Sequence, residues 1–494
     1  MPKIKRYVVL EIVLLLGALA YYLFFVNKGI ELFDEGYFVH AAERIFQGEQ
    51  PYKDFALQYS PTYFYLLAFL YKIFGPSILV GRFLSLFTCL LIILVTFAIL
   101  NKLKINSYKI ILLSFLSLIS FGYPLINIPN IAWMNVLATT VFMLVYVYWI
   151  SSNNVEQYIF LILMGLLLVL SLSLKQNFGI ALIILSVPLI ILGKKASLTQ
   201  IAKNLIIMFG IWFLLTFAWI YFFFLRDNFQ FLIQFVGYSR RFALQTAFSY
   251  PPLTYIFQPL GIFKLLPYYL PVLLFFVAFV SLFKRNKNIK IVALSFIVVG
   301  EFAVSIYPQS DLLHIYPFFG LILVLLLVSL YKSRLSFLST GIIIVTILTG
   351  FYLTLFREYY RYNPPYRFQN TPLNLPRAKG ILIQKTTAEN LISLSDFINK
   401  RTSKNDYIFS YPYYPMIYFI LERRNPSKDL IYEIRLWHQY DDKIILNEIK
   451  QKKVKYIVTS YGYVFDSDIS RFITKQKEVF KNESFKVFEV AILK

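Results

Sequence analysis

Long hydrophobic runs, separated by short polar stretches, occupy most of the first 356 residues. About eleven of them approach the roughly 20 apolar residues that a helix needs to cross a bilayer. They lie at 7–26, 77–100, 110–125, 131–150, 158–174, 178–192, 205–225, 262–283, 289–307, 315–331 and 337–356. A shorter apolar piece, 61–75, contains Lys72 and is expected to lie along the membrane interface. The pattern predicts a polytopic α-helical membrane protein with about eleven spans.

The pattern changes after residue 356. Residues 357–387 are rich in Tyr, Pro and Arg, which indicates a linker. From residue 388 onward, short apolar stretches alternate with amphipathic ones, which is typical of a small α/β domain. Helices are expected near 391–399, 441–452 and 468–477, and strands near 406–412, 455–461 and 485–492. We therefore expect a transmembrane domain at 1–356, with a first outer loop at 27–76, and an α/β domain at 388–494.

Composition supports the membrane prediction and excludes other classes. Hydrophobic residues make up 58% of the chain and charged residues 15%, whereas a soluble domain has about 25% charged residues. The single cysteine, Cys89, lies inside an apolar run, which excludes a disulfide framework and a cysteine-based metal site. The net charge of +23 fits basic loops and anionic lipid head groups. Because basic–aromatic nucleic-acid motifs are absent from the sequence, nucleic acid is not an expected partner.

The distribution of Lys and Arg predicts the orientation. Basic clusters precede the first apolar run and follow the second, sixth, eighth and tenth, so they all fall on one side. The positive-inside rule makes that side cytoplasmic, together with the N-terminus. The first run is long and lacks a small-residue cleavage site, so we expect an uncleaved helix. The first loop, Lys175, the loop 226–260 and the α/β domain are then expected outside the plasma membrane.

The first outer loop carries two adjacent acids, Asp34 and Glu35, at the head of an amphipathic segment. The simplest interpretation is a pair of solvated acids at a helix N-terminus, where the helix dipole favours negative charge. The loop is also dense in Gly, Pro and Tyr, which indicates a defined shape. Adjacent helical residues point about 100° apart, so the two acids are not expected to face one reacting bond equally.

An ordered set of motifs follows these acids: Gly48-Glu49-Gln50-Pro51-Tyr52-Lys53-Asp54, Tyr59-Ser60-Pro61, Phe74-Gly75 and Gly81-Arg82. The set resembles the GT-C-fold glycosyltransferases that use polyprenyl-phosphate sugars, namely bacterial relatives of the protein O-mannosyltransferases and lipid A aminoarabinose transferases. Two later stretches also look familial: Leu174-Lys175-Gln176-Asn177 and His314-Ile315-Tyr316-Pro317, although an Arg is expected where His314 stands. The resemblance covers the membrane part of the chain.

The resemblance implies that the protein moves a sugar from a polyprenyl phosphate to an acceptor, with a hydroxyl expected, at the outer face. Such a leaving group is a stable anion, so it needs cations more than a general acid. The acceptor hydroxyl needs a base, which a carboxylate in a partly apolar loop can provide. The resemblance assigns Asp34 as this base, because the matching family motif places catalysis on its first acid, and Glu35 is then expected to orient the acceptor or tune Asp34. One base and direct displacement predict inversion at the anomeric carbon.

The donor phosphate is expected to contact basic residues at the outer boundary; the candidates are Lys175, Arg82, Arg240 and Arg241, with Lys264 as a weaker one. The alternative for each is a basic side chain that snorkels to lipid head groups. The substrate cavity is expected to include Tyr37, Asp54, Tyr59, Gln176, Glu301 and His314. Glu301 stands out because an ionisable group inside a membrane span is costly and often functional.

No cofactor or metal site is required by the sequence, although a divalent cation held by Asp34 and Glu35 remains open. The expected partners are the polyprenyl-phosphate sugar, membrane lipids and an envelope glycan, lipid or protein as acceptor. Two alternatives remain: a transporter or flippase of lipid-linked saccharides, and a polymerase or ligase of surface polysaccharide. No pair of broken helices indicates an inverted repeat, and an α/β tail is unusual for a carrier, so the transferase is favoured.

Overall fold

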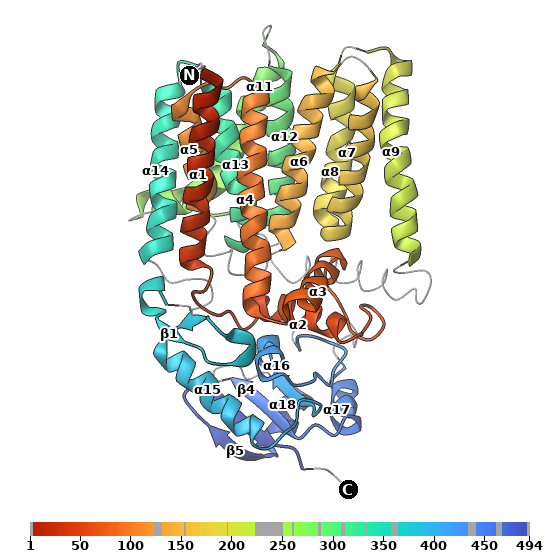
Figure 1. The fold of residues 1–494 in the computed structure, drawn as a ribbon, viewed down its shortest axis with the longest axis vertical. Helices are drawn as coiled ribbons and strands as arrows, with labels where there is room; N and C mark the ends of the chain where they lie inside the picture. Colours follow the sequence, from red (N-terminus) through yellow and green to blue (C-terminus); the bar gives the residue numbers. More distant parts are fainter. Residues whose placement is uncertain are drawn as a thin grey trace.

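The computed structural model describes residues 3–121, 131–152, 155–194, 196–222, 250–258, 261–284, 288–307, 312–331, 333–356, 364–432, 441–460 and 467–491. A layer of upright helices forms one part of the molecule, and the C-terminal region packs against one end of it (Figure 1). The N-terminal end of the first helix lies at the opposite end of this bundle.

Each of the eleven predicted apolar runs coincides with one helix of the bundle. These helices are α1 (Lys3–Phe25), α4 (Ile78–Lys102), α5 (Tyr108–Ser120), α6 (Ile131–Ser151), α7 (Glu156–Leu174), α8 (Gln176–Gly193), α9 (Leu198–Ile220), α11 (Gly261–Leu282), α12 (Ile289–Ile306), α13 (Leu312–Leu330) and α14 (Ser336–Phe356). Within the described residues, nine helices are long and apolar enough to cross a membrane, and α5 and the apolar part of α13 are shorter. A short 3-10 helix, η3 (Leu253–Phe257), precedes α11.

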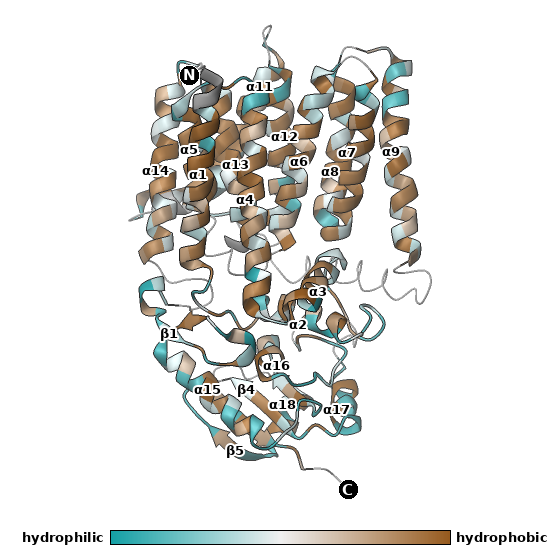
Figure 2. Ribbon diagram, in the orientation of Figure 1, coloured by the Kyte–Doolittle hydropathy of each residue, from teal (hydrophilic) through white to brown (hydrophobic). Residues whose placement is uncertain are grey.

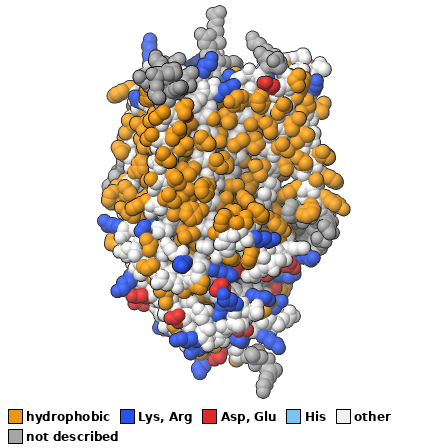
Figure 3. Space-filling model, in the orientation of Figure 1, with side chains coloured by type: hydrophobic (Ala, Val, Ile, Leu, Met, Phe, Trp, Pro, Cys, Tyr) orange, Lys and Arg blue, Asp and Glu red, His pale blue; other side chains and the backbone are white. Residues whose placement is uncertain are grey.

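The surface of the bundle fits a lipid environment. Hydrophobic residues follow the upright helices along their length, whereas the C-terminal region is more hydrophilic (Figure 2). The space-filling view shows a broad hydrophobic band with charged side chains gathered beyond its two edges (Figure 3). Because helices satisfy all their backbone hydrogen bonds internally, this arrangement is stable in a bilayer. The chain is a multi-pass membrane protein.

Two short helices of the first loop, α2 (Asp34–Phe46) and α3 (Thr62–Phe74), lie across the end of the bundle that faces the C-terminal region (Figure 1). Helix α3 has 13 residues, too few to cross a bilayer. It exposes Phe69, Ile73 and Phe74, which suits a helix that lies along the membrane interface.

The C-terminal region is an α/β domain, as predicted. Its sheet has the order β3-β4-β6-β5, with β3 (Ile408–Tyr411) parallel to β4 (Tyr456–Ser460) and the other pairs antiparallel. The remaining elements are β5 (Lys477–Lys481), β6 (Phe485–Glu489), α15 (Lys385–Asn399), α16 (Pro415–Leu421), α17 (Asp442–Gln451) and α18 (Asp468–Thr474). The sequence analysis predicted neither strand β5 nor helix α16. They have five and seven residues, which is too short for a clear hydrophobic period.

Part of the predicted linker is folded. It contains η4 (Tyr366–Phe368), β1 (Thr371–Pro372), η5 (Pro376–Ala378) and β2 (Leu382–Ile383). Leu382 exchanges backbone hydrogen bonds with the first loop: its N–H donates to Asn27 at 2.7 Å, and its carbonyl accepts from Gly29 at 2.8 Å. The apolar side chains of this segment are buried without a regular spacing, which hides them from a periodicity search.

Candidate active site

The turn that carries Asp34 is held by a reciprocal pair of carboxylates. The carboxylate of Glu31 accepts hydrogen bonds from the backbone N–H of Phe33 at 3.1 Å and of Glu35 at 2.9 Å. The carboxylate of Glu35 accepts in turn from the N–H of Glu31 at 3.2 Å. This arrangement resembles a capping box and places half-buried Asp34 at the first residue of α2. The sequence analysis did not identify Glu31, because glutamate is not among the residues that usually cap a helix N-terminus.

Glu35 and Arg82 form a buried, bidentate ion pair at the foot of this turn. Arg82 Nε donates to one Glu35 oxygen at 2.6 Å, and Nη2 donates to the other at 2.9 Å. The remaining guanidinium donors bond the backbone carbonyls of Val26, Lys28 and Gly29 at 2.8–3.1 Å. Both side chains are almost completely buried, at 0% and 1% exposed. Burial raises the pKa of Glu35, and the Arg82 guanidinium opposes that rise.

This geometry changes the role expected for Arg82. A guanidinium has five N–H donors, and here the Glu35 carboxylate and three backbone carbonyls take all five. Arg82, expected from the sequence at the donor phosphate, therefore has no donor left for a phosphate oxygen. The pair instead fastens the start of α4 to the first loop on both sides of residue 31. A single sequence does not reveal which acid an arginine will meet.

Within the first loop, Tyr37 of α2 lies next to Tyr59. The Tyr37 hydroxyl accepts a hydrogen bond from the N–H of Gln58 at 2.8 Å, and the two tyrosine rings are 6.2 Å apart. The Tyr52 hydroxyl donates to the Tyr59 carbonyl at 2.6 Å. The Asp54 carboxylate stabilises the backbone of the loop: it accepts a hydrogen bond from the N–H of Gln50 at 2.7 Å and closes a turn. The residues around 58–60 are therefore fixed against α2.

The junction between α7 and α8 brings Lys175 and Gln176 to this loop. Lys175 is buried, and its ammonium lies 5.4 Å from the centre of the Tyr59 ring and 4.8 Å from that of Phe178. Gln176 Nε2 donates to the Gln58 carbonyl at 3.3 Å. Aromatic faces stabilise a cation, and a buried ammonium at a membrane boundary is a strong site for an anion. The Lys175 motif and the first loop thus meet, and the Gln58–Gln176 bond joins residues 118 positions apart in sequence.

Glu301 and His314 lie on helices that pack near this junction. Asn177 Nδ2 donates to the Val304 carbonyl at 3.4 Å, which joins α8 to α12. One turn from Glu301 on α12, the Ser305 hydroxyl donates to the His314 carbonyl on α13. Glu301 is fully buried, and neither of its carboxyl oxygens has a hydrogen-bond partner among the residues that the structure describes. These bonds join α8, α12 and α13 close to the residue after Gln176.

Three predicted basic residues are not placed. Arg240 and Arg241 lie outside the described residues, as does the side chain of Lys264. In the described part of the chain, no three His, Cys, Asp or Glu side chains form a group that could hold a metal ion. Both Glu35 oxygens bond the Arg82 guanidinium, so the Glu35 carboxylate already has a cationic partner at this turn.

Solved structures identify the fold. No protein-family model and no curated protein matches the chain. The crystal structure of ArnT from Cupriavidus metallidurans in the apo state aligns with a TM-score of 0.60 and 13% identity, over 99% of this chain and 98% of ArnT. This chain has the ArnT fold. The structure of ArnT bound to undecaprenyl phosphate aligns with a TM-score of 0.58 and 12% identity, over 98% of each chain.

The GT-C fold predicted from the first-loop motifs is thereby confirmed. The alignment with ArnT, a lipid A aminoarabinose transferase, includes the C-terminal domain, which the sequence resemblance does not cover. A crystal structure of the Archaeoglobus fulgidus oligosaccharyltransferase, in complex with Zn and sulfate, has a TM-score of 0.44 and 10% identity, over 90% of this chain and 68% of that chain. At these identities the likeness to ArnT establishes the fold, and the chemistry is argued from the residues of this chain.

Proposed function

We propose that this protein is an inverting glycosyltransferase that moves a sugar from a polyprenyl phosphate to an acceptor hydroxyl. One observation carries the proposal: a half-buried carboxylate, Asp34, and a buried ammonium, Lys175, lie at the same end of the bundle. Tyr37, Tyr59 and Gln176 connect the elements that carry them. A base and a cation in one polar boundary layer are the groups that displacement of a lipid phosphate requires.

In this proposal Lys175 binds the donor phosphate. The phosphate is the leaving group, and the ammonium stabilises the negative charge that it gains as the sugar–oxygen bond breaks. The aromatic rings around Lys175 exclude water and thereby strengthen this electrostatic interaction. The likeness to ArnT, which was crystallised with undecaprenyl phosphate, supports a lipid of this class as the donor. Gln176, Glu301 and His314 would then line the same cavity.

Asp34 accepts the proton of the acceptor hydroxyl as the oxygen attacks the anomeric carbon. The partly buried position of Asp34 supports this role, because a less hydrated carboxylate is a better base. Glu35 does not share the task, since Arg82 engages both of its oxygens. The pair Glu35–Arg82 orients the turn so that Asp34 faces the acceptor. Direct displacement with a single base inverts the anomeric carbon.

The positive-inside rule places this end of the bundle at the outer face of the plasma membrane. The substrate side therefore holds the first loop and the α/β domain, and the N-terminus is cytoplasmic. The acceptor would come from the cell envelope, as a glycan, a lipid or a protein. Arg240 and Arg241 stay candidates for a second phosphate contact.

The test is sugar transfer by the purified protein in lipid nanodiscs, with radiolabelled polyprenyl-phosphate sugars and a crude envelope fraction as acceptor. We expect wild type to move label to the acceptor, and Asp34→Asn to lose transfer. Lys175→Met should weaken the use of donor, whereas Lys72→Met, an exposed lysine on α3, should not. Transfer by Asp34→Asn at the wild-type rate would remove the base from Asp34. Label that crosses liposome bilayers without reaching an acceptor would favour a flippase.

A further inference from the structure

Helix α16 of the C-terminal domain is inserted against the first loop. All seven of its residues are buried, and it packs on α2 between the bundle and the sheet (Figure 1). If the C-terminal domain only sat on the surface of the protein, such a helix would be exposed on one face and would carry polar residues there. The complete burial of α16 shows that the C-terminal domain and the first loop share one hydrophobic core.

The contacts of α16 are concentrated on the residues that flank Asp34. The N–H of Met416 donates to the carbonyl of Leu32 at 3.2 Å. The rings of Tyr413 and Phe33 lie edge to face, 5.6 Å apart. A Cβ at Gly36 would lie 2.4 Å from the Met416 nitrogen, so only glycine permits this approach. Residues 413–416, which we call the docking turn, thus touch the chain just before and just after Asp34.

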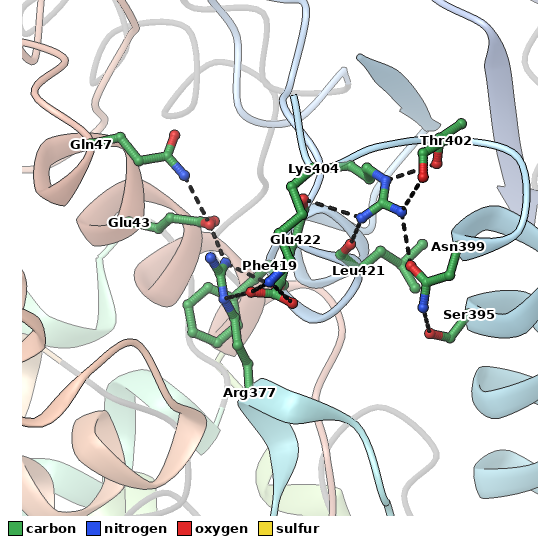
Figure 4. A network of polar contacts seen from close by, with 11 residues as sticks. Glu43, Gln47, Arg377, Ser395, Asn399, Thr402, Lys404, Phe419, Leu421 and Glu422 are labelled. Atoms are coloured by element: carbon green, nitrogen blue, oxygen red, sulfur yellow. Dashed lines mark hydrogen bonds and ion pairs between the residues drawn. The ribbon is translucent and has the colours of Figure 1, made fainter. Parts of the chain in front are cut away.

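A network of polar contacts, buried on its Glu43 side, also joins α2 to the C-terminal region (Figure 4). Glu43 bonds Arg377, whose guanidinium also donates to the Phe419 carbonyl at 3.0 Å. Arg377 lies 3.5 Å from Glu422 at the end of α16, and Lys404 lies 2.9 Å from the same acid. These ion pairs have little exposure to solvent on the Glu43 side, so they fix the angle between α16 and α2.

A second set of contacts joins the loop beyond α2 to the domain. Arg44 Nη1 donates to the Ser427 carbonyl at 2.9 Å, and the N–H of Ala56 donates to the Lys428 carbonyl at 2.9 Å. The C-terminal domain therefore contacts the first loop before α2, along α2 and after the end of α2. Rigid support from several sides is what a reacting group needs to keep its geometry.

We propose that the docking turn positions Asp34 for catalysis, with Tyr413 as the positioning residue and Gly36 as its counterpart in the loop. This inference rests on the proposed function, in which Asp34 is the base. Tyr413 packs on the residue before Asp34, and Met416 holds Leu32 and faces Gly36. A shift of about 1 Å in a reacting group lowers a rate by as much as a hundredfold. The C-terminal domain is thus a working part of the active site.

The kinetic test compares Tyr413→Ala with Phe480→Ala in the full chain. Phe480 lies on β5, the strand farthest from β3, and packs on Phe397 within the domain. We expect Tyr413→Ala to lower kcat on the order of tenfold to a hundredfold at unchanged KM for the donor. Phe480→Ala should leave kcat within about twofold. Tyr413→Phe keeps the ring that packs on Phe33 and should restore kcat.

A second readout does not depend on activity. In Asp34→Cys, a nitroxide spin label attached at residue 34 reports the motion of the turn, because the native Cys89 is buried. We expect Tyr413→Ala and Gly36→Ala to increase the mobility of this label in nanodiscs, and Phe480→Ala to leave it unchanged. Spectra that respond equally to Tyr413→Ala and Phe480→Ala would overturn the positioning role.

The two readouts separate the failure of the inference from that of the proposed function. If wild type transfers no sugar from any polyprenyl-phosphate donor, the proposed function fails, and the spin-label spectra alone decide whether residues 413–416 hold the turn. If wild type transfers sugar and Tyr413→Ala retains its kcat, the function stands and the positioning role is refuted. A melting temperature lowered equally in Tyr413→Ala and Phe480→Ala, with kcat lost only in Tyr413→Ala, supports the proposal.

Discussion

Removal of Arg82 is the sharpest test of the site architecture. In Arg82→Met, a side chain of similar length replaces the guanidinium. The change leaves the Glu35 carboxylate, which is 0% exposed, without its bidentate partner. It also takes hydrogen-bond donors from the carbonyls of Val26, Lys28 and Gly29. The Glu35 carboxylate and the bonds to Val26 and Gly29 are buried, and the bond to Lys28 is partly buried.

The magnitude follows from the burial of this pair. Breaking a buried ion pair by removal of one partner destabilises a protein by about 3–5 kcal/mol, because an uncompensated charge stays behind. Replacing both partners by apolar residues is often close to neutral. In Arg82→Met/Glu35→Met the buried charge is gone, while the three carbonyls have lost donors and the Glu31 N–H has lost its acceptor. We expect a coupling free energy of about 2 kcal/mol between the two positions.

Cys89 provides the assay. It is the single cysteine of the chain and is buried on α4, seven residues after Arg82. A maleimide dye that fluoresces on reaction with a thiol therefore reports unfolding directly during a thermal ramp. We expect Arg82→Met to melt well below wild type, and the double variant to melt above Arg82→Met. A double variant as unstable as the sum of the two single changes would refute the buried pair.

Three further predictions test other parts of the molecule. Burial lowers the pKa of His40 in the folded protein below the value of about 6.5 that an unfolded histidine has. Between these two pKa values the unfolded chain binds a proton that the folded protein does not, so stability should fall as the pH drops below about 6.5. His40→Gln should therefore flatten the dependence of the melting temperature, monitored by tryptophan fluorescence, on pH. Glu301→Gln replaces a buried carboxyl group that lacks a described hydrogen-bond partner with a neutral amide of similar shape, so the thiol-dye melting temperature should stay close to that of wild type. A drop of several degrees would contradict this environment and mean that Glu301 is ionised and paired. A Cβ at Gly165 would lie 2.5 Å from the Met208 carbonyl oxygen, so Gly165→Ala should push α7 away from α9 and lower the melting temperature. Gly210→Ala is the control, because no atom lies within 4 Å of a Cβ at that position. Equal melting temperatures of the two variants would contradict this packing.

The sequence predicted best those elements in which the surroundings of each position, lipid or water, decide the type of side chain there. A membrane span needs an apolar side chain at nearly every position, so the eleven runs and the eleven helices coincide. The acids of the first loop and the α/β pattern after residue 388 are likewise readable one position at a time. Short or irregular segments were missed: α16 has seven residues, and the folded part of 357–387 buries apolar residues without a period.

The sequence by itself therefore determined that the chain spans a membrane many times, that acids follow its first span, and that an α/β domain follows its last. Only the tertiary structure decided which side chains meet. It paired Arg82 with Glu35, brought Lys175 to Tyr59, and set Tyr413 of the last domain against Phe33 of the first loop. The physical reason is that hydropathy and period encode whether a residue is buried, whereas the choice of partner depends on how segments far apart in the sequence pack together.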